Sequence, residues 1–173
     1  LRIENEKNWA FIVHRLDRET SGVMIFAKHK RHKEYLQEQF AQRDVHRVYH
    51  ALVQGVPDRN GGTIHEWLLE DKFLRVKSVN KRNPNAKEAI THWSIEDNDD
   101  FASLLMLTIE TGRRHQIRVG LANMGHPVIG DEQHGADGNP IGRIALHASA
   151  LELLHPETDD PIRFDAIIPF GPE

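Results

Sequence analysis

The stretch HRVYHALVQG, residues 46–55, carries the clearest structural signal in this sequence of 173 residues. Its side chains alternate between two faces, with Val48, His50 and Leu52 on one face and Tyr49, Ala51 and Val53 on the other. A period of two predicts a β-strand. Gly55 and Pro57 predict where that strand ends.

Two further elements are expected on the N-terminal side of this strand. The mostly apolar, β-rich run GVMIFA, residues 22–27, predicts a buried strand. Residues 29–43 predict an amphipathic helix, because lysines and glutamates surround one less polar side. The residues of that side are Tyr35, Leu36, Gln39 and Phe40.

More strands are expected on the C-terminal side, at residues 61–70, 73–79, 88–97, 101–110, 143–154 and 161–170. Between them, residues 111–125 predict a helix, because Ile117, Leu121 and Met124 recur at helical spacing. Thr111 is the expected cap near its start. Together these elements predict an α+β fold, with a mixed, mainly antiparallel sheet and a few flanking helices.

The composition is that of a folded protein of ordinary domain size, with 39% apolar and 28% charged residues. No apolar run approaches the length of about 18 residues that a membrane helix needs. The chain has no cysteine, which excludes disulfides and thiolate chemistry. It starts with Leu1 and no signal peptide follows, so we expect it to begin inside a longer gene product.

The net charge of −4 argues against a protein coated in basic residues. It does not argue against a local basic groove, because the distribution of charge decides nucleic-acid binding. Basic residues do gather, at positions 28–33, 43–47 and 113–118.

The first candidate catalytic residue is Asp17, in the stretch HRLDRETSG at residues 14–22. An aspartate before Thr-Ser-Gly is commonly a turn or capping residue. Arg15, however, stands close enough to reach the same cavity, and the expected strand would hold the loop rigidly. A carboxylate fixed at the entrance of a strand can serve as a nucleophile, a general base or a charge stabiliser.

The second candidate is the stretch TGRRHQIR, residues 111–118. Five polar or cationic residues crowd the first turns of the expected helix: Arg113, Arg114, His115, Gln116 and Arg118. Cations at a helix N-terminus oppose the helix dipole, so local stability does not favour them there. A phosphate ligand does, because helix amides and arginine forks both bind it. The alternative is a solvated basic face.

Other chemistries lack a matching motif. Five histidines follow no compact metal-ligand spacing, so no metal is expected: His115, His126, His134, His147 and His155. There is no Walker-type loop, no G-x-G-x-x-G after a strand and no G-x-S-x-G elbow. The glycine-rich run GADGNPIG, residues 135–142, is typical of a mobile loop.

Four segments match, in order, the motifs of one enzyme family. HRLDRETSG agrees with H-R-L-D-x-x-T-S-G, and RVYHALVQG with K-x-Y-x-A-x-V-x-G, apart from Arg47 in place of lysine. TGRRHQIRVGLANMGHPVIGD is similar to T-G-R-x-H-Q-I-R…G-H-P-I-x-G-D, and RIALHASALELLHP to R-x-x-L-H-A…H-P. The chain therefore resembles the RluA/RsuA-type RNA pseudouridine synthases, most closely the RluA-like branch, from His14 to Pro169.

The resemblance implies a pseudouridine synthase-like catalytic domain that converts uridine in RNA to pseudouridine. In that reaction the N1–C1′ glycosidic bond breaks and the base rejoins the sugar through C5. Asp17 is implied as the catalytic carboxylate, whether it attacks C1′, adds to C6 or takes the C2′ proton. Because the reaction is a net isomerisation, no redox cofactor or metal is expected.

Six further residues are implied to bind substrate. Tyr49 would stack on the target uracil, and Arg143 would pair with Asp17 and keep it ionised. Arg15 would fill the space that a flipped-out uridine leaves, or hold the backbone. Three others would support the Asp17 loop or contact phosphates: Arg113, Gln116 and Arg118.

The expected partner is ribosomal or transfer RNA, in the cytoplasm and away from membranes. Residues 1–173 are expected to form a single catalytic domain, without an S4-like RNA-binding domain and without the family's usual N-terminal segment ahead of Asn8. Gly120 and His134 stand where a histidine and a tyrosine are common. Two alternatives remain open: a non-catalytic RNA-binding relative, and a nucleoside glycosidase with Glu110 as its second carboxylate.

Overall fold

The computed structural model describes residues 9–171, which form one long sheet with helices on it. The sheet has eight strands, in the order β10-β9-β4-β8-β7-β5-β6, with β2 paired to β9 off this path. Its strands are β2 Ser21–Gly22, β4 His46–Gln54, β5 Gly61–Glu70, β6 Val76–Ser78, β7 Lys87–Asn98, β8 Ala102–Ile109, β9 Leu146–Leu154 and β10 Pro161–Asp165. Every pair along the path is antiparallel, and β2 pairs with β9 in parallel. The predicted α+β fold is confirmed.

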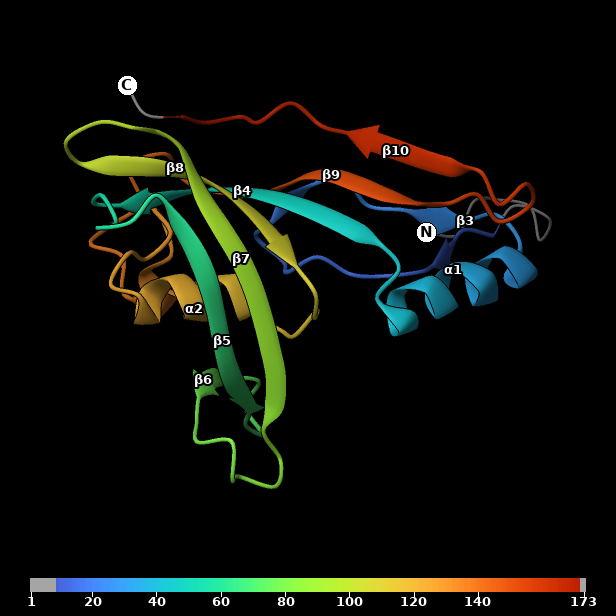
Figure 1. Cartoon of the computed structure of the whole chain (residues 1–173), viewed down its shortest axis with the longest axis horizontal. Coiled ribbons are helices and arrows are strands. Elements are labelled where there is room, and N and C mark those ends of the chain that lie inside the picture. The colour runs from blue at the N-terminus through green and yellow to red at the C-terminus, as the bar shows by residue number, and fades with distance from the viewer. Residues whose placement is uncertain (1–8, 172–173) are drawn as a thin grey trace.

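The remaining elements lie around this sheet. They are the two-stranded sheet of β1 Phe11–Ile12 and β3 Phe26–Ala27, helices α1 Lys30–Gln42 and α2 Gln116–Asn123, and the 3₁₀ turn Glu132–His134. Figure 1 shows α1 and α2 on the same side of the long sheet, near opposite ends. Within residues 9–171, no helix is long and apolar enough to cross a membrane. The expectation about the segment ahead of Asn8 lies outside the described residues.

Strand β4 lies at the centre of the sheet, between β8 and β9. The predicted strand is confirmed here, and both of its faces are covered. Ala51 and Val53 are fully buried, and they share a core with Leu105 and Leu107 of β8. Helix α2 closes that core from one side through Leu121. A second core lies under α1 and includes Leu36 together with Leu151 and Leu153 of β9.

The prediction of one continuous strand at residues 22–27 is wrong. The chain changes partners within that run, since Ser21 and Gly22 pair with β9, whereas Phe26 and Ala27 pair with β1. Met24 and Phe26 are exposed, which an alternating strand at the surface allows but a buried strand does not. The other predicted strands exist, with β6, β9 and β10 shorter than predicted.

The predicted start of the second helix is also wrong. Helix α2 begins at Gln116, and its N-cap is His115 in the left-handed region, at φ 52°. Thr111 does not cap it. The Thr111 hydroxyl instead accepts the backbone N–H of Ile90 at 2.9 Å and donates to Gln116 Oε1 at 2.7 Å. Because these bonds fold residues 111–115 into a turn against β7, Arg113 and Arg114 precede the helix.

The parallel pairing of β2 with β9 depends on Gly22. Its φ is +114°, and a Cβ there would lie 2.1 Å from the Ala148 carbonyl oxygen. That oxygen accepts the backbone N–H of Val23 at 2.8 Å, so the two backbones are in direct contact. A side chain at position 22 is excluded both by conformation and by space.

We expect Gly22→Ala to destabilise the fold by about 2 kcal/mol or more, since it combines a left-handed strain with a backbone clash. Urea unfolding measures this loss. Gly125→Ala is the matched control, because Gly125 also has a positive φ of +88° but nothing within 4 Å of the added atom. Equal losses in the two variants would contradict a close packing of Gly22 on β9.

Candidate functional site

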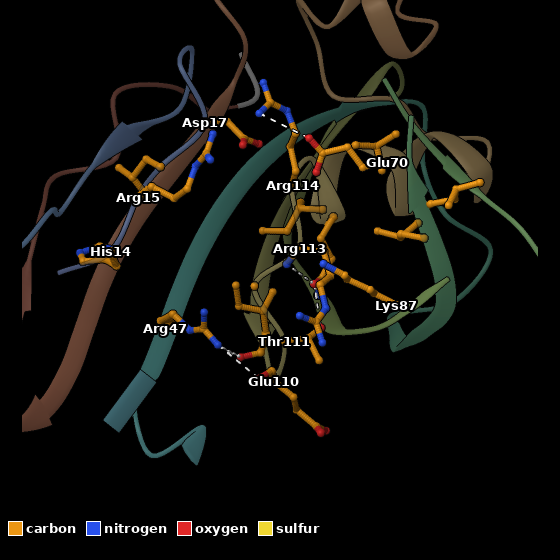
Figure 2. A pocket seen from close by; sticks show the side chains of 18 of the residues that line it. His14, Arg15, Asp17, Arg47, Glu70, Lys87, Glu110, Thr111, Arg113 and Arg114 are labelled. Atoms are coloured by element: carbon orange, nitrogen blue, oxygen red, sulfur yellow. Dashed lines mark hydrogen bonds and ion pairs between the residues drawn. The ribbon is translucent and has the colours of Figure 1, made fainter. Parts of the chain in front are cut away.

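A large cavity of about 1120 Å³ lies between the end of α1 and the start of α2. Its walls come from several parts of the chain: the loop of residues 14–20, the end of α1, the start of β4, the end of β5 with the β5–β7 connection, the turn of residues 109–117, and Leu146 of β9. Figure 2 shows His14, Arg15 and Asp17 on one wall, with Glu70, Arg113 and Arg114 on the facing wall. The site therefore joins segments that lie far apart in the sequence.

The loop that carries Asp17 is fixed at both ends. At its start, His14 Nε2 accepts the backbone N–H of Ile25 at 3.0 Å, and the imidazole stacks on Phe40 of α1 with ring centroids 4.8 Å apart. At its end, Ser21 Oγ lies 2.7 Å from His147 Nδ1, next to the Gly22 contact. Within the loop, the Thr20 N–H donates to the Asp17 carbonyl oxygen at 3.0 Å. Asp17 is thus half-buried on a rigid support.

The hydrogen bond to His14 requires a neutral ring, because Nε2 acts as the acceptor. Burial and the nearby positive charge of Arg47 lower the pKa of His14 from 6.5 to about 4. The first residue of the HRLD stretch is therefore a neutral positioning group at physiological pH.

Asp17 faces the cavity together with Tyr49, which points from β4 beside a register shift between Val48 and Tyr49. Burial raises the pKa of Tyr49; the Arg47 charge opposes this and the Asp17 charge adds to it. The phenol therefore stays protonated at neutral pH. Among the described residues, the Asp17 carboxylate has no hydrogen bond or ion pair, so its oxygens are free to meet a ligand.

Two of the predicted substrate-binding residues do not line the cavity. Arg143 donates to the hydroxyl of Ser21 and, through Nε, to the Ile144 carbonyl oxygen at 3.2 Å. Its guanidinium also lies over the Phe170 ring, 5.9 Å from the centroid. In residues 9–171 it makes no ion pair with Asp17, so the expected pairing does not occur in this structure. Instead, Arg143 braces the end of the Asp17 loop through Ser21.

Arg118 is the second such residue, and it is only 2% exposed. Its guanidinium forms a bidentate ion pair with Asp131, with Nε–Oδ2 at 2.6 Å and Nη2–Oδ1 at 2.7 Å. Burial opposes the charged form, but the hydrogen bond and charge of Asp131 raise the pKa of Arg118. Glu19, in the Asp17 loop, lies 3.9 Å away. This placement fits support of the loop and does not fit a contact with phosphate.

Every hydrogen-bonding group of the Gln116 side chain has a partner within the protein. Its Oε1 accepts from Thr111 Oγ1 at 2.7 Å and from the Arg113 N–H at 3.0 Å. Its Nε2 donates to the Ile90 carbonyl oxygen at 2.9 Å and to Thr91 Oγ1 at 3.0 Å. Gln116 therefore shapes the turn that presents Arg113 and Arg114 to the cavity.

The cavity is basic although the chain is acidic. Seven cations line it, namely Arg15, Arg43, Arg47, Lys72, Lys87, Arg113 and Arg114. Four acids line it as well, namely Asp17, Glu70, Asp71 and Glu110. The lining thus carries an excess of positive charge in a protein whose net charge is −4. Such a surface attracts a polyanion.

Arg47 is the most buried cation of this lining, at 9% exposure. It donates to the carbonyl oxygens of Ile109 at 3.4 Å and Glu110 at 3.2 Å, and it forms no ion pair with a described carboxylate. Burial lowers the pKa of Arg47. The Nε atoms of Arg47 and Arg114 are buried without a hydrogen-bond partner among the described residues. Unsatisfied cations of this kind fit an anionic ligand.

Several residues that build the site had no supporting role assigned from the sequence: His14, Ser21, Asp131 and the pair His115–His134. His115 Nδ1 lies 3.0 Å from His134 Nε2; burial lowers the pKa of both imidazoles, and the Asp17 charge opposes this shift. Asp131 lies four residues before the glycine-rich run of residues 135–142, and it is 1% exposed. Only its place at the end of the G-H-P…G-D motif gave a hint of its role.

The comparisons with known proteins agree with this geometry. A family model described as RNA pseudouridylate synthase matches residues 1–123. The chain belongs to the RNA pseudouridylate synthase family. This family membership confirms the resemblance that the four motifs gave.

Individual members of the family resemble the chain over most of its length. An uncharacterized RNA pseudouridine synthase of Zymomonas mobilis is 39% identical, over 94% of this chain and 75% of its own. Ribosomal large subunit pseudouridine synthase D of Xanthomonas campestris is 36% identical, over 92% of this chain and 52% of its own. The human RNA pseudouridylate synthase domain containing 1 has the same fold, with a TM-score of 0.82 and 26% identity over 94% of this chain and 70% of its own. The chain spans about half the length of most of the curated relatives it matches.

We expect the contribution of neutral His14 to stability to depend on pH. The unfolded chain binds this proton near pH 6.5, whereas the folded chain binds it only near pH 4. The contribution is therefore full above pH 6.5 and is lost as the pH falls toward 4. Urea unfolding of the parent and of His14→Gln at several pH values measures it. The stability difference between them should shrink across this range, and a constant difference would contradict the assignment.

Asp131→Asn should cost about 3–5 kcal/mol of stability, because it leaves the buried Arg118 charge without a countercharge. Denaturant unfolding at neutral pH measures the loss. Asp165→Asn is the control, since its ion pair with Arg163 at 2.9 Å lies at the surface and a far smaller loss is expected. A comparable effect of the two substitutions would show that Arg118 does not depend on Asp131.

Proposed function

We propose that this protein is an RNA pseudouridine synthase, with Asp17 as its catalytic carboxylate. The observation that carries the proposal is an unpaired carboxylate on a rigid loop, facing a cavity with excess positive charge. A polyanionic substrate is attracted by the lining, and the carboxylate is then the reactive group at its centre. Membership of the RNA pseudouridylate synthase family supports the same chemistry.

Tyr49 and Asp17 have different roles toward the target uridine. Tyr49 offers an aromatic face on a central strand, so the uracil stacks there as a neutral ring on a protonated phenol. Asp17 then acts on the sugar or the base while the N1–C1′ bond breaks and the C5–C1′ bond forms. Because both groups sit on the sheet and on a loop fixed to it, they hold the reacting uridine in one orientation.

A uridine stacked in RNA cannot reach Asp17, so it must be flipped into the cavity. Arg15 is exposed on the same loop, two residues before Asp17, and it is placed to fill the vacated space or to hold the strand. Arg113 and Arg114 face it across the cavity and fit phosphate binding. Arg118, Gln116 and Arg143 act indirectly in this proposal, by bracing the Asp17 loop and the facing turn.

The two alternatives explain the site less well. A glycosidase needs a second catalytic carboxylate. Glu110 lines the cavity, but it is engaged by His92 at 2.8 Å and lies 3.9 Å from Arg43. A non-catalytic RNA-binding relative would have no use for an unpaired Asp17 beside Tyr49.

We favour ribosomal RNA as the substrate class, because relatives named for the large ribosomal subunit match nearly the whole chain. Transfer RNA is the second choice. The cytoplasm is the compartment that we favour. Mapping of pseudouridines in total RNA from cells with and without the gene, by carbodiimide treatment and primer extension, identifies the modified position. The RNA that lacks a pseudouridine in the cells without the gene is the substrate.

We expect Asp17→Asn to fold and to bind RNA, but to lose isomerisation by a factor of about 10³ or more, because an amide is neither an anionic nucleophile nor a base. Release of tritium from RNA that contains 5-tritiated uridine measures the reaction. Asp58→Asn, an exposed aspartate that does not line the cavity, serves as the control and should keep the parent rate. An active Asp17→Asn variant would refute the catalytic role.

A further inference from the structure

Tyr49 stands between two residues whose side chains point to the other face of the sheet. Tyr49 lines the cavity of Asp17, whereas Val48 and His50 line a hollow of about 460 Å³ on the opposite face. Among the described residues, the Tyr49 hydroxyl has no hydrogen-bond partner. The direction of its ring therefore depends on packing and on the backbone of β4 around it.

Two β-bulges supply the residues that contact His50 on that opposite face. In β9 an extra residue, Ser149, stands opposite the peptide that joins Val48 and Tyr49. In β7 an extra residue, Glu96, interrupts the pairing with β8. A bulge re-aims the side chain of its extra residue, and bulges are common beside active sites. Here both bulges direct a polar side chain to the same imidazole.

His50 is held from two sides by these residues. Ser149 Oγ lies 2.7 Å from Nδ1 of the imidazole, and Glu96 Oε2 lies 2.8 Å from Nε2. The Ser149 hydroxyl also donates to the Val48 carbonyl oxygen at 3.2 Å. His50 and Ser149 are each only 6% exposed, so water competes little for these bonds. The contacts connect β9, β4 and β7 on one face of the sheet.

The three residues lie outside the defined positions of the four motifs. His50 stands at an unspecified position of K-x-Y-x-A-x-V-x-G, Ser149 follows the defined part of R-x-x-L-H-A, and Glu96 lies in none of the motifs. Apolar side chains would cover this face with a smaller desolvation cost than a buried imidazole and hydroxyl. Directional hydrogen bonds instead fix one arrangement of the backbone.

We propose that His50, Ser149 and Glu96 form a positioning network for Tyr49, which they hold through the backbone of β4 from the face opposite the reaction. Ser149 contacts both neighbours of Tyr49, Val48 through its carbonyl oxygen and His50 through its ring. Glu96 fixes the other side of that ring. The residues before and after Tyr49 are thereby held, so its ring enters the cavity in one direction.

The proposal rests on the proposed function, because it takes Tyr49 as the residue that stacks on the target uracil. A ring in one direction places the stacked uracil at one distance from Asp17, which the reaction requires. Serine, histidine and glutamate in contact also form the relay that activates a nucleophilic serine in hydrolases. Here the Ser149 hydroxyl donates to a backbone carbonyl group, which fits a positioning role better than a nucleophile.

The first test is steady-state kinetics of tritium release by Ser149→Ala. We expect kcat to fall by about 10-fold to 100-fold, the cost of a misplaced reacting group. The KM for RNA should stay near that of the parent, because the cationic lining of the cavity is unchanged. Glu96→Gln should lower kcat in the same way but less, since its amide still reaches His50. Ser149→Thr keeps the hydroxyl and should restore the parent kcat.

Matched controls separate positioning from stability. Ser103 of β8 is fully buried and donates to the Gly55 carbonyl oxygen at 2.9 Å, so Ser103→Ala removes a bond of the same kind from the same sheet. Glu157 Oε1 lies 3.2 Å from His32 Nε2, so Glu157→Gln alters a histidine–glutamate pair away from β4. Both variants should keep the parent kcat. Urea unfolding checks that Ser149→Ala and Ser103→Ala lose comparable stability.

The second test observes Tyr49 without turnover. The chain has two tyrosines, and the other one, Tyr35, lies on α1 outside the cavity. In Tyr35→Phe protein grown with tyrosine that carries ¹³C at Cζ, the labelled resonance comes from Tyr49 alone. Adding Ser149→Ala should shift or broaden this resonance, whereas adding Ser103→Ala should leave it in place.

Either an unmoved resonance or a parent kcat in Ser149→Ala would overturn the proposal. An equal loss of kcat in Ser149→Ala and Ser103→Ala would also overturn it, because the loss would then follow stability. A parent protein that releases no tritium would refute the proposed function instead. The resonance would still decide whether the network holds Tyr49, so the two failures are distinguishable.

Discussion

The contact between Gly22 and Ala148 is the constraint on which the site depends. It attaches the segment that carries Asp17 to β9, and β9 lies beside β4, which carries Tyr49. A clash at 2.1 Å for any Cβ at position 22 means that no other residue allows the two backbones to approach so closely. Without this short parallel pairing, the loop would depend on side-chain contacts, chiefly those of His14, Glu19 and Ser21, to hold it over the sheet. The position of the carboxylate thus follows from a glycine five residues later.

A second constraint acts on the other wall of the cavity. Gln116 ties the turn of residues 111–115 to β7, and Arg118 ties α2 to Asp131. Both side chains are buried; Gln116 has partners for all of its hydrogen-bonding groups, and Arg118 donates to Asp131 and Gln133. The arginines that face the ligand, Arg113 and Arg114, differ because they stand in the turn before the helix. Buried polar groups with complete partners make the wall rigid, and the groups with incomplete partners remain for binding.

The sequence predicts the sheet well, because a period of two is a local property. The strand around Tyr49 and the helix at residues 29–43 are both found where they were expected. The start of α2 was placed too early, because the hydrogen bonds of Thr111 to Ile90 and Gln116 decide it, and Ile90 lies on another strand. The split of residues 22–27 has the same origin: two short pairings with different partners look like one strand in a sequence.

The sequence predicted part of the cavity lining, but it did not predict the residues that support it. Asp17, Arg15, Tyr49 and Arg113 all line one cavity, as the motifs implied. Arg118 and Arg143 share those motifs, yet their guanidinium groups point into the protein, toward Asp131 and Ser21. A motif records which residue types a site needs, but it does not say whether an arginine holds the ligand or holds the loop. The residue to which each arginine donates its hydrogen bonds makes that distinction, and this residue is distant in the sequence.

The electrostatics of the cavity lining are unfavourable, and this bears on the kind of ligand that it fits. Arg47 is buried without a carboxylate partner among the described residues, His14 is kept neutral beside it, and two guanidinium Nε atoms lack any acceptor there. The buried Arg47 charge and the Nε atoms without an acceptor cost stability in the free protein. A ligand that brings negative charge to the cavity offsets that cost, whereas a neutral ligand does not. Relief of this unsatisfied charge by a polyanion supports the proposed binding of RNA to a chain of net charge −4.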